Sequence, residues 1–260
     1  MRPHTGLLIV NADDWGGESS ATDAILTCFE SGAVTSATAM VHMADSRRAS
    51  EVALRHALPV GLHLNLTLPF DEPETPGPAR ERQARAAELL GASRAHWSWL
   101  PGSERLIRRC VADQLAEFER LYGRAPTHLD GHSHVHLSPN VLLARILPRE
   151  LAIRRAQNWP PRNTLTARVA RTARAVWTAR RPTTELFTSV RAVHPRFGGR
   201  GLDELLDRSR SVSVEIMTHP QWSDELALLT SEEWRAALRG CPLGCYEDLS
   251  SSARARAGAG

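Results

Sequence analysis

The chain has 260 residues, of which 42% are hydrophobic, and a formal net charge of +3 at pH 7. A chain of this size can bury a full core as one domain, and so mild a charge does not by itself argue for nucleic acid. All 32 basic residues are arginine, which excludes a Schiff-base lysine and the lysine of a P-loop. The four cysteines lack the spacing of a zinc site and are expected to be free thiols. We expect a cytoplasmic protein, because no signal peptide or apolar run of about 18 residues is present.

Short apolar runs alternate with helical patterns in the first part of the chain. In chain order we expect the strand Leu7–Asn11, the helix Ser20–Ser31, the strand Val34–Val41, the helix Ser46–Ala57 and the strand Val60–Thr67. This alternation predicts βα units and a parallel sheet, or a barrel closed from one.

Two excursions interrupt the later part of the chain. Pro69–Pro78 contains four prolines and is expected to be a loop, followed by a helix over 79–90 that completes an insertion reaching Pro101. A stripe of apolar residues predicts a helix over Glu104–Tyr122, which Gly123 ends. The remaining expected elements are a strand from Pro126, a helix after Pro139, a second excursion from Trp159, a late strand over Ser211–Thr218 and helices through Leu238.

The sequence also predicts the bounds of the domain and the character of one basic segment. Residues 1–249 are expected to form the domain and residues 250–260 a disordered tail. The segment Thr164–Arg181 carries five arginines and no acidic residue. A solvated basic face on an insertion is favoured there over a phosphate- or RNA-binding helix.

The adjacent carboxylates Asp13 and Asp14 follow the first apolar run. On an extended strand they would point to opposite faces, but Gly16 and Gly17 allow the backbone to turn. One carboxylate can then bind a metal ion while its neighbour acts as a base. The alternative is an Asx turn with an N-cap for the next helix.

His63 lies in an expected strand in which His63, Asn65 and Thr67 share one face. A polar face on a central strand is costly unless it lines a site. A lone strand histidine is more often a satisfied core residue, so His63 depends on the other segments for its interpretation.

The run His128–His136 holds four histidines and an aspartate. If the run is extended, Asp130, His132, His134 and His136 face the same way. Each is then about 6.6 Å along the strand from the next. An ion with imidazole nitrogens near 2.1 Å cannot take several of them, so we expect one ligand here and supporting or substrate contacts from the rest. A tag-like metal-scavenging run is the alternative. Three segments that each end an apolar run in Asp or His are typical of a metallo-hydrolase on a parallel α/β scaffold.

At these residues the chain resembles the YdjC/ChbG family of carbohydrate deacetylases. The resembling pieces run in family order from residue 7 to about 249: LLIVNADDWG, AVTSATAMV, GLHLNLT, PTHLDGHSHVH, VEIMTHP and LGCYEDL. The resemblance implies a distorted (β/α) TIM-like barrel, a single domain with loop insertions, that removes an N-acetyl group from an amino sugar with a divalent ion.

Carried over onto matching positions, the resemblance implies metal ligation by Asp14, His63 and His132. It implies that Asp13 is the general base and that His219, which follows the late strand, is the acid or a substrate contact. The candidates for substrate binding are Trp15, Asp130, His134 and His136. The chain departs from the family pattern at Trp15, where phenylalanine is usual, and at Ser133, where a histidine is common.

One ion per chain is expected, with Zn²⁺ favoured by two imidazoles and one carboxylate and Mg²⁺ left open. The acetylated sugar is not identified: a chitooligosaccharide, a glycolipid hexosamine and a secondary-metabolite sugar all fit. No nucleic-acid or membrane partner is expected, and a homodimer is left open.

Two other functions compete with deacetylation. One is hydrolysis of another bond, such as a phosphoester, for which Asp130, His134 and His136 would supply a second metal site. The other is a non-catalytic sugar- or nucleic-acid-binding protein that uses the arginine segment.

Overall fold

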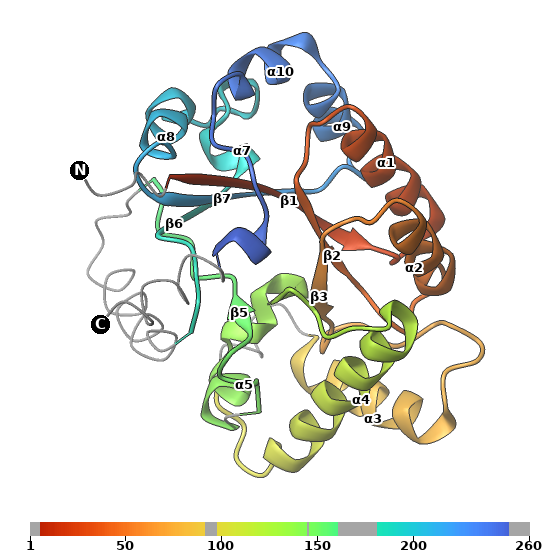
Figure 1. Ribbon diagram of the computed structural model, residues 1–260. Coiled ribbons are helices and arrows are strands. Elements are labelled where there is room, and N and C mark those ends of the chain that lie inside the picture. Colours follow the sequence, from red (N-terminus) through yellow and green to blue (C-terminus); the bar gives the residue numbers. More distant parts are fainter. Residues whose placement is uncertain (1–5, 92–97, 145, 161–180, 250–260) are drawn as a thin grey trace. The chain divides into compact units, whose positions relative to one another are not determined.

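The computed structural model describes residues 6–91, 98–144, 146–160 and 181–249 (Figure 1). These residues form two compact units, each built from separate stretches of the chain. The first unit draws on Met1–Asp13, Asp23–Ala37 and Ala152–Gly260, and the second on Asp14–Thr22 and Thr38–Leu151. Strands and helices alternate along both, so the predicted α/β organisation is confirmed.

The first unit is centred on β7 (Ser213–Thr218), which pairs in parallel with β1 (Leu7–Trp15) and with β6 (Leu186–Ser189). Leu8 stands opposite Val214, and Phe187 stands opposite Glu215. Leu8, Ile9 and Val10 of β1 and Val214 and Ile216 of β7 are fully buried, as expected of parallel strands covered on both faces. The unit also contains β5 (Ala152–Ile153) and the helical segments α7 (Val190–Val193), η3 (Pro195–Phe197), α8 (Leu202–Arg208), α9 (Ser223–Leu229) and α10 (Glu232–Leu238).

Three elements near the start of the chain contribute residues to both units. They are β1, whose last two residues belong to the second unit, α1 (Ser19–Glu30) and β2 (Ser36–Ala39). The boundary in β1 falls between Asp13 and Asp14. Each of these two carboxylates therefore belongs to a different unit.

The second unit contains the parallel pair β3 (Val60–Leu64) and β4 (His128–Gly131), in which His63 stands opposite Asp130. A Cβ on Gly61 would lie 2.4 Å from His128 Nδ1, so no side chain fits at this position. The helical segments of this unit are α2 (Ser46–Arg55), α3 (Gly77–Leu90), α4 (Glu104–Tyr122), η2 (His132–Leu137) and α5 (Pro139–Ala144).

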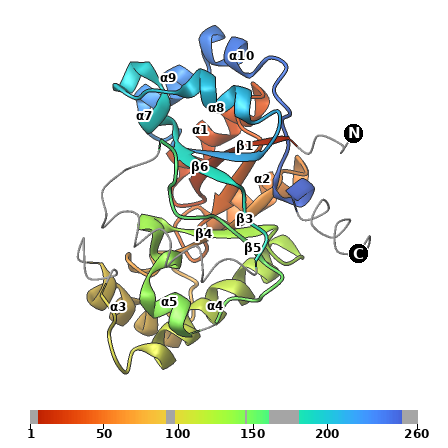
Figure 2. The same cartoon turned by 90° about the vertical axis from the view of Figure 1, so that its left-hand side faces the viewer.

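Helices α3 and α4 lie side by side (Figures 1 and 2), and each sends a buried glutamine to the segment that follows β3. Gln114 Oε1 accepts from the Asn65 N–H at 2.9 Å, and Gln114 Nε2 donates to the Asn65 carbonyl at 2.6 Å. Gln83 Nε2 donates to the Leu68 carbonyl at 2.6 Å. These bonds satisfy backbone groups beyond the end of the strand and hold the chain directly after His63.

The long helix is predicted best. Its predicted bounds, Glu104–Tyr122, are those observed, and Gly123 caps it in the left-handed conformation with φ 66°. The strands are placed correctly but with shifted ends: β1 continues through Asp13 and Asp14 to Trp15, whereas β3 stops at Leu64.

The end of β3 corrects the expectation for Asn65. Its side-chain oxygen accepts from the N–H groups of Thr67 and Leu68 at 3.1 and 2.9 Å, which is a turn, and not an alternating strand face. All five residues of β3 are buried, so both of its faces are covered.

Three remaining expectations concern elements late in the chain, the cysteines and the segments at 164–181 and 250–260. The elements β5, β6, α7 and α8 have no predicted counterpart. All four cysteines are free, as expected. The arginine segment, apart from Arg181, and the whole expected tail at 250–260 lie outside the described residues.

Candidate functional site

Three side chains of the second unit, Asp14, His63 and His132, meet at the ends of separate elements. Asp14 lies at the end of β1, His63 near the end of β3, and His132 directly after β4. Asp14 Oδ1 lies 3.1 Å from His63 Nε2 and 3.3 Å from His132 Nδ1. The two imidazole rings are edge to face, with centroids 5.8 Å apart. The structure thus brings together the three residues that the sequence predicts as metal ligands.

A backbone turn aims Asp14 at the histidines. Its φ of 70° lies in the left-handed region, which aspartate tolerates better than most residues. The Gly17 N–H donates to the Asp14 carbonyl at 3.1 Å and closes the turn. Because Asp14 leaves the extended conformation, its side chain need not alternate with that of Asp13 across the strand.

His63 is oriented from behind by Asp130. The Nδ1–H of His63 donates to Asp130 Oδ1 at 2.7 Å, and the Thr38 hydroxyl donates to Asp130 Oδ2 at 3.0 Å. Both His63 and Asp130 are buried. A proton held on Nδ1 by Asp130 leaves Nε2, which faces Asp14, as the nitrogen available to a metal ion, and this is how a carboxylate orients a metal-binding histidine.

The histidine run is not one extended strand. β4 ends at Gly131, and η2 begins at His132 with left-handed residues at Ser133 (φ 53°) and His134 (φ 57°). The expectation that Asp130, His132, His134 and His136 share one face is therefore wrong beyond Gly131. A change of backbone conformation replaces the two-residue period, and His132 is the member of the run that meets Asp14.

The charges in this group are mutually dependent. Burial alone would raise the pKa of Asp14, but hydrogen bonds with His132 and His63 hold that pKa well below its usual value. Burial alone would lower the pKa of His63, but Asp130 and Asp14 hold that pKa well above its usual value. Two carboxylates thus stabilise positive charge at this position.

The three side chains fit a divalent ion. Two ligand atoms at about 2.1 Å from one ion and at tetrahedral angles lie about 3.4 Å apart. The separations of 3.1 and 3.3 Å from Asp14 Oδ1 to the two ring nitrogens are close to that value. Two imidazoles and one carboxylate are ligands suited to Zn²⁺ and similar transition ions, and three protein ligands leave coordination positions for water and substrate.

A second group of polar side chains surrounds Asp13 in the first unit. Arg154 donates from Nη1 to Asp13 Oδ2 at 2.6 Å and from Nη2 to Asp13 Oδ1 at 2.7 Å. Its Nε donates to Glu215 Oε1 at 2.7 Å, and the Tyr246 hydroxyl donates to Glu215 Oε2. Arg154, Glu215 and Tyr246 are fully buried. One guanidinium is thus shared by two carboxylates in a network whose members orient one another.

His219 lies beside this network, with Nε2 at 4.0 Å from Asp13 Oδ2. Its ring stacks on Trp222 at a centroid distance of 4.4 Å and an angle of 15°. The His219 N–H donates to Glu225 Oε2 at 2.7 Å, and Arg191 Nε donates to Glu225 Oε1 at 2.7 Å. Burial raises the pKa of Glu225, and the hydrogen bonds with His219 and Arg191 oppose that rise. His219 is thus held through both its ring and its backbone.

Comparison with known proteins identifies the family. The model of the YdjC-like protein family matches residues 7–240, about nine tenths of the chain. The chain belongs to the YdjC-like protein family. A chitooligosaccharide deacetylase from Yersinia pestis (strain Pestoides F) is 33% identical to it over 93% of this chain and 98% of the relative.

Two further matches differ in how much of each chain they cover. A human carbohydrate deacetylase is 38% identical over 52% of this chain, and the matched region spans only 42% of that relative. The solved structure of an Enterococcus faecalis protein, whose name refers to cellobiose-phosphate cleavage, matches with a TM-score of 0.68 at 24% identity over 94% of this chain and 98% of that chain. At this identity the match shows the fold alone, and it confirms the expected α/β fold of the distorted (β/α) barrel type.

The residues predicted to bind substrate differ in how deeply they are buried in this YdjC-like chain. Trp15, Asp130 and His136 are fully buried, and their contact with a substrate stays a prediction. Trp15 is the last residue of β1 and is buried in the core. Asp130 accepts a hydrogen bond from His63. His134 is partly exposed and stays a candidate.

The sequence patterns predict no role for Arg154, Glu215 and Tyr246. The usable signal was a glutamate inside the apolar strand VSVEIM, because a charge buried in a central strand needs a partner. That partner, Arg154, is 61 residues away and could not be read from a local pattern. Tyr246 lies in LGCYEDL, a segment that carries the family resemblance.

The second metal site required by a two-ion phosphoesterase is not assembled from the expected residues. Among the described residues, no group of three potential ligands includes His134 or His136. His42, Glu72 and Glu117 do lie close together. However, Arg47 pairs with Glu72, and Arg120 donates to Glu117 at 2.6 Å, so arginines already neutralise both carboxylates.

A membrane span is also not observed. No helix in the described ranges is long and apolar enough to cross a bilayer.

Proposed function

We propose that this chain is a metal-dependent carbohydrate deacetylase that hydrolyses the N-acetyl group of an amino sugar to acetate and a free amine. One observation carries the proposal: Asp14, His63 and His132 converge, with Asp130 orienting His63, in a chain of the YdjC-like family. The chitooligosaccharide deacetylase relative, matched along nearly its whole length, supports an acetylated amino sugar as the substrate class.

Asp14, His63 and His132 would hold one divalent ion, with Zn²⁺ favoured by the donor set. When bound, such an ion polarises a carbonyl oxygen and lowers the pKa of a water molecule from about 15.7 towards 7.

Asp13 accepts the proton of the attacking water as the water oxygen bonds to the acetyl carbon. Covalent geometry supports this role, since consecutive α-carbons lie about 3.8 Å apart and Asp13 directly precedes the proposed ligand Asp14. Arg154 fixes both oxygens of Asp13 but divides its charge with Glu215, so the network of one guanidinium and two carboxylates keeps a net negative charge.

His219 protonates the departing sugar amine as the carbon–nitrogen bond breaks, which leaves acetate and the free amine. Its proximity to Asp13 and its stacking on Trp222 support this role. An amine is a poor leaving group unless it is protonated.

The test is a screen of N-acetylated amino sugars, including chitooligosaccharides, with zinc-loaded protein. Acetate and free amine should be released in equal amounts, and Asp14→Asn should abolish both. A phosphomonoester is included to test the competing hydrolase. Phosphate release without any acetate from the sugars would contradict the proposal.

A further inference from the structure

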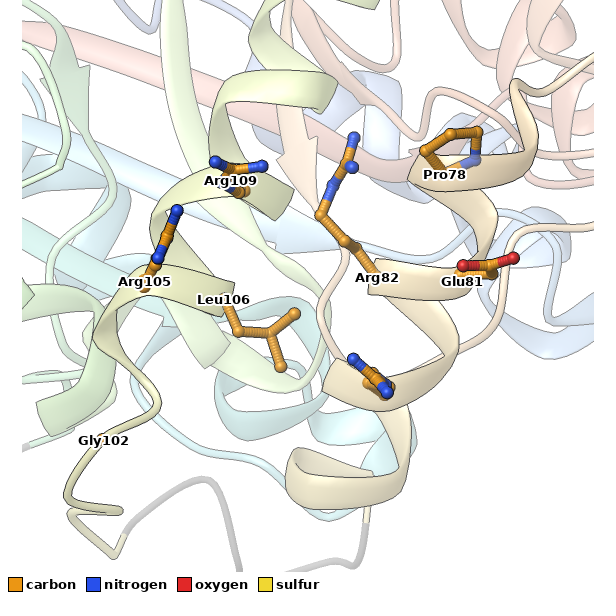
Figure 3. A pocket seen from close by; sticks show the side chains of 8 residues that line it. Pro78, Glu81, Arg82, Gly102, Arg105, Leu106 and Arg109 are labelled. Carbon is orange, nitrogen blue, oxygen red and sulfur yellow. The ribbon is translucent and has the colours of Figure 1, made fainter.

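A groove of about 410 Å³ lies between α3 and α4, on residues that the proposed chemistry does not use. Figure 3 shows the side chains that line it from both helices. Its lining consists of Pro78, Glu81, Arg82, Arg85, Gly102, Arg105, Leu106 and Arg109. The groove therefore gathers four arginines against one glutamate, and its volume is that of a small-molecule site.

Helix spacing places these arginines together. Arg82 and Arg85 are three residues apart on α3, and Arg105 and Arg109 are four residues apart on α4. Side chains at these spacings are neighbours on a helix surface, and like charges placed so destabilise a helix. Both helices carry such a pair, and both pairs line the same groove.

Most of this positive charge is not neutralised by acidic side chains among the described residues. Arg82 forms two hydrogen bonds with Asp113, from Nε at 2.8 Å and from Nη2 at 2.9 Å. Arg85, Arg105 and Arg109 make no ion pair or side-chain hydrogen bond within the described part of the chain. Asp113, four residues after Arg109 on α4, is thus already engaged by Arg82.

Several surface arginines elsewhere are paired with acidic residues nearby in sequence, whereas others, such as Arg55 and Arg200, stand singly without an ion pair among the described residues. The pairs are Arg48 with Asp45, Arg120 with Glu117, Arg208 with Glu204 and Arg235 with Glu232. In the groove, the corresponding neighbour of Arg85 is Glu81, and no ion pair joins them among the described residues. The groove thus brings together, on two adjacent helices, three arginines that no acidic side chain of the described residues pairs with: Arg85, Arg105 and Arg109.

We infer that this groove is a binding site for a small ligand that carries neighbouring phosphate groups. Guanidinium groups match phosphate oxygens with paired hydrogen bonds, and several of them around one cavity favour a multivalent anion over a single charge. Leu106 and Pro78 add apolar surface for the rest of such a ligand. A nucleic acid is less suitable, because specific protein–DNA interfaces bury about 1,000 Å² or more of protein surface. The inference does not depend on the proposed deacetylase activity.

The test is isothermal titration calorimetry of the full metal-loaded chain with inorganic pyrophosphate at low salt. The wild type should bind, and affinity should fall as salt rises. Arg105→Ala and Arg109→Ala should each weaken binding about tenfold or more, because each removes charge-assisted hydrogen bonds. Arg108→Ala is the matched control: it removes the same charge from an exposed position on the same helix, and Arg108 does not line the groove.

Pyrophosphate also binds metal ions, so Asp14→Ala is titrated in parallel and should retain binding. The inference is overturned by no binding at low salt, by equal affinities of Arg108→Ala and Arg109→Ala, or by loss of binding in Asp14→Ala. Binding of a single-stranded oligonucleotide without binding of pyrophosphate would also overturn it.

Discussion

Asp13 and Asp14 are consecutive in the chain and occupy opposite chemical environments. In the first unit, both oxygens of Asp13 accept from the buried guanidinium of Arg154. In the second unit, Asp14 faces two imidazoles, His63 and His132. A carboxylate held by a permanent cation keeps its orientation without any metal, whereas one that faces neutral or protonatable nitrogens is suited to share an ion with them. Two adjacent residues can therefore take different roles.

The largest expected effect is on the rate, through Asp13. Asp13→Asn keeps the shape of the side chain but removes the proton acceptor, so deacetylation should fall by about 10²–10⁴-fold, the usual contribution of a general base. The measurement is the rate of acetate release at saturating zinc. Activity close to that of the wild type would exchange the roles given to Asp13 and Asp14.

A substitution of His219, which lies beside Asp13, tests whether this residue protonates the leaving amine. His219→Ala should strongly reduce hydrolysis of the amide and largely spare an activated acetyl ester, whose leaving group departs without a proton. Rates on the two substrates are compared in the same preparation. Equal losses on both would indicate a structural or positioning role instead of proton donation.

Arg154 tests whether the Asp13 environment depends on its buried cation. Arg154→Met leaves the carboxylates of Asp13 and Glu215 without their guanidinium, so unfolding free energy should fall by about 3–5 kcal/mol, as for other broken buried pairs. Denaturant unfolding measures the change. Arg235→Met is the control, because its pair with Glu232 is exposed and should contribute at most about 1 kcal/mol. Equal effects in the two variants would contradict the account of the network.

A substitution of Asp130 tests whether its hydrogen bond to His63 holds that proposed metal ligand in position. Asp130→Asn keeps the size of the side chain but weakens the orientation of His63, so zinc affinity should fall about 10–100-fold. A competition titration with a chelating dye measures it. Thr38→Val is the milder variant, because it removes only the hydroxyl that donates to Asp130. Unchanged affinity in Asp130→Asn would show that His63 is held without it.

Local patterns predict a large part of this fold and of the metal group. The helix Glu104–Tyr122 is predicted to the residue because a sustained apolar stripe and a left-handed glycine mark it. Asp14, His63 and His132 are predicted from apolar runs that end in Asp or His together with the family resemblance, and the structure brings them together. Their roles as ligands stay predictions.

The rest depends on information that is not local. Left-handed turns at Asp14, Ser133 and His134 change the directions of side chains that a two-residue period would assign. The pairing of Arg154 with Asp13 joins residues 141 positions apart. Such contacts follow from the assembled fold, and no spacing along the chain reveals them.

The most direct test of the central claim is the zinc content of Asp13→Asn and Asp14→Asn, purified and dialysed side by side. The two variants make the same chemical change at adjacent positions, so elemental analysis isolates the difference in environment. We predict about one bound ion per chain in Asp13→Asn, as in the wild type, and a loss of the ion in Asp14→Asn. Full zinc occupancy in Asp14→Asn, or loss of zinc in Asp13→Asn alone, would contradict the division of roles between the two carboxylates.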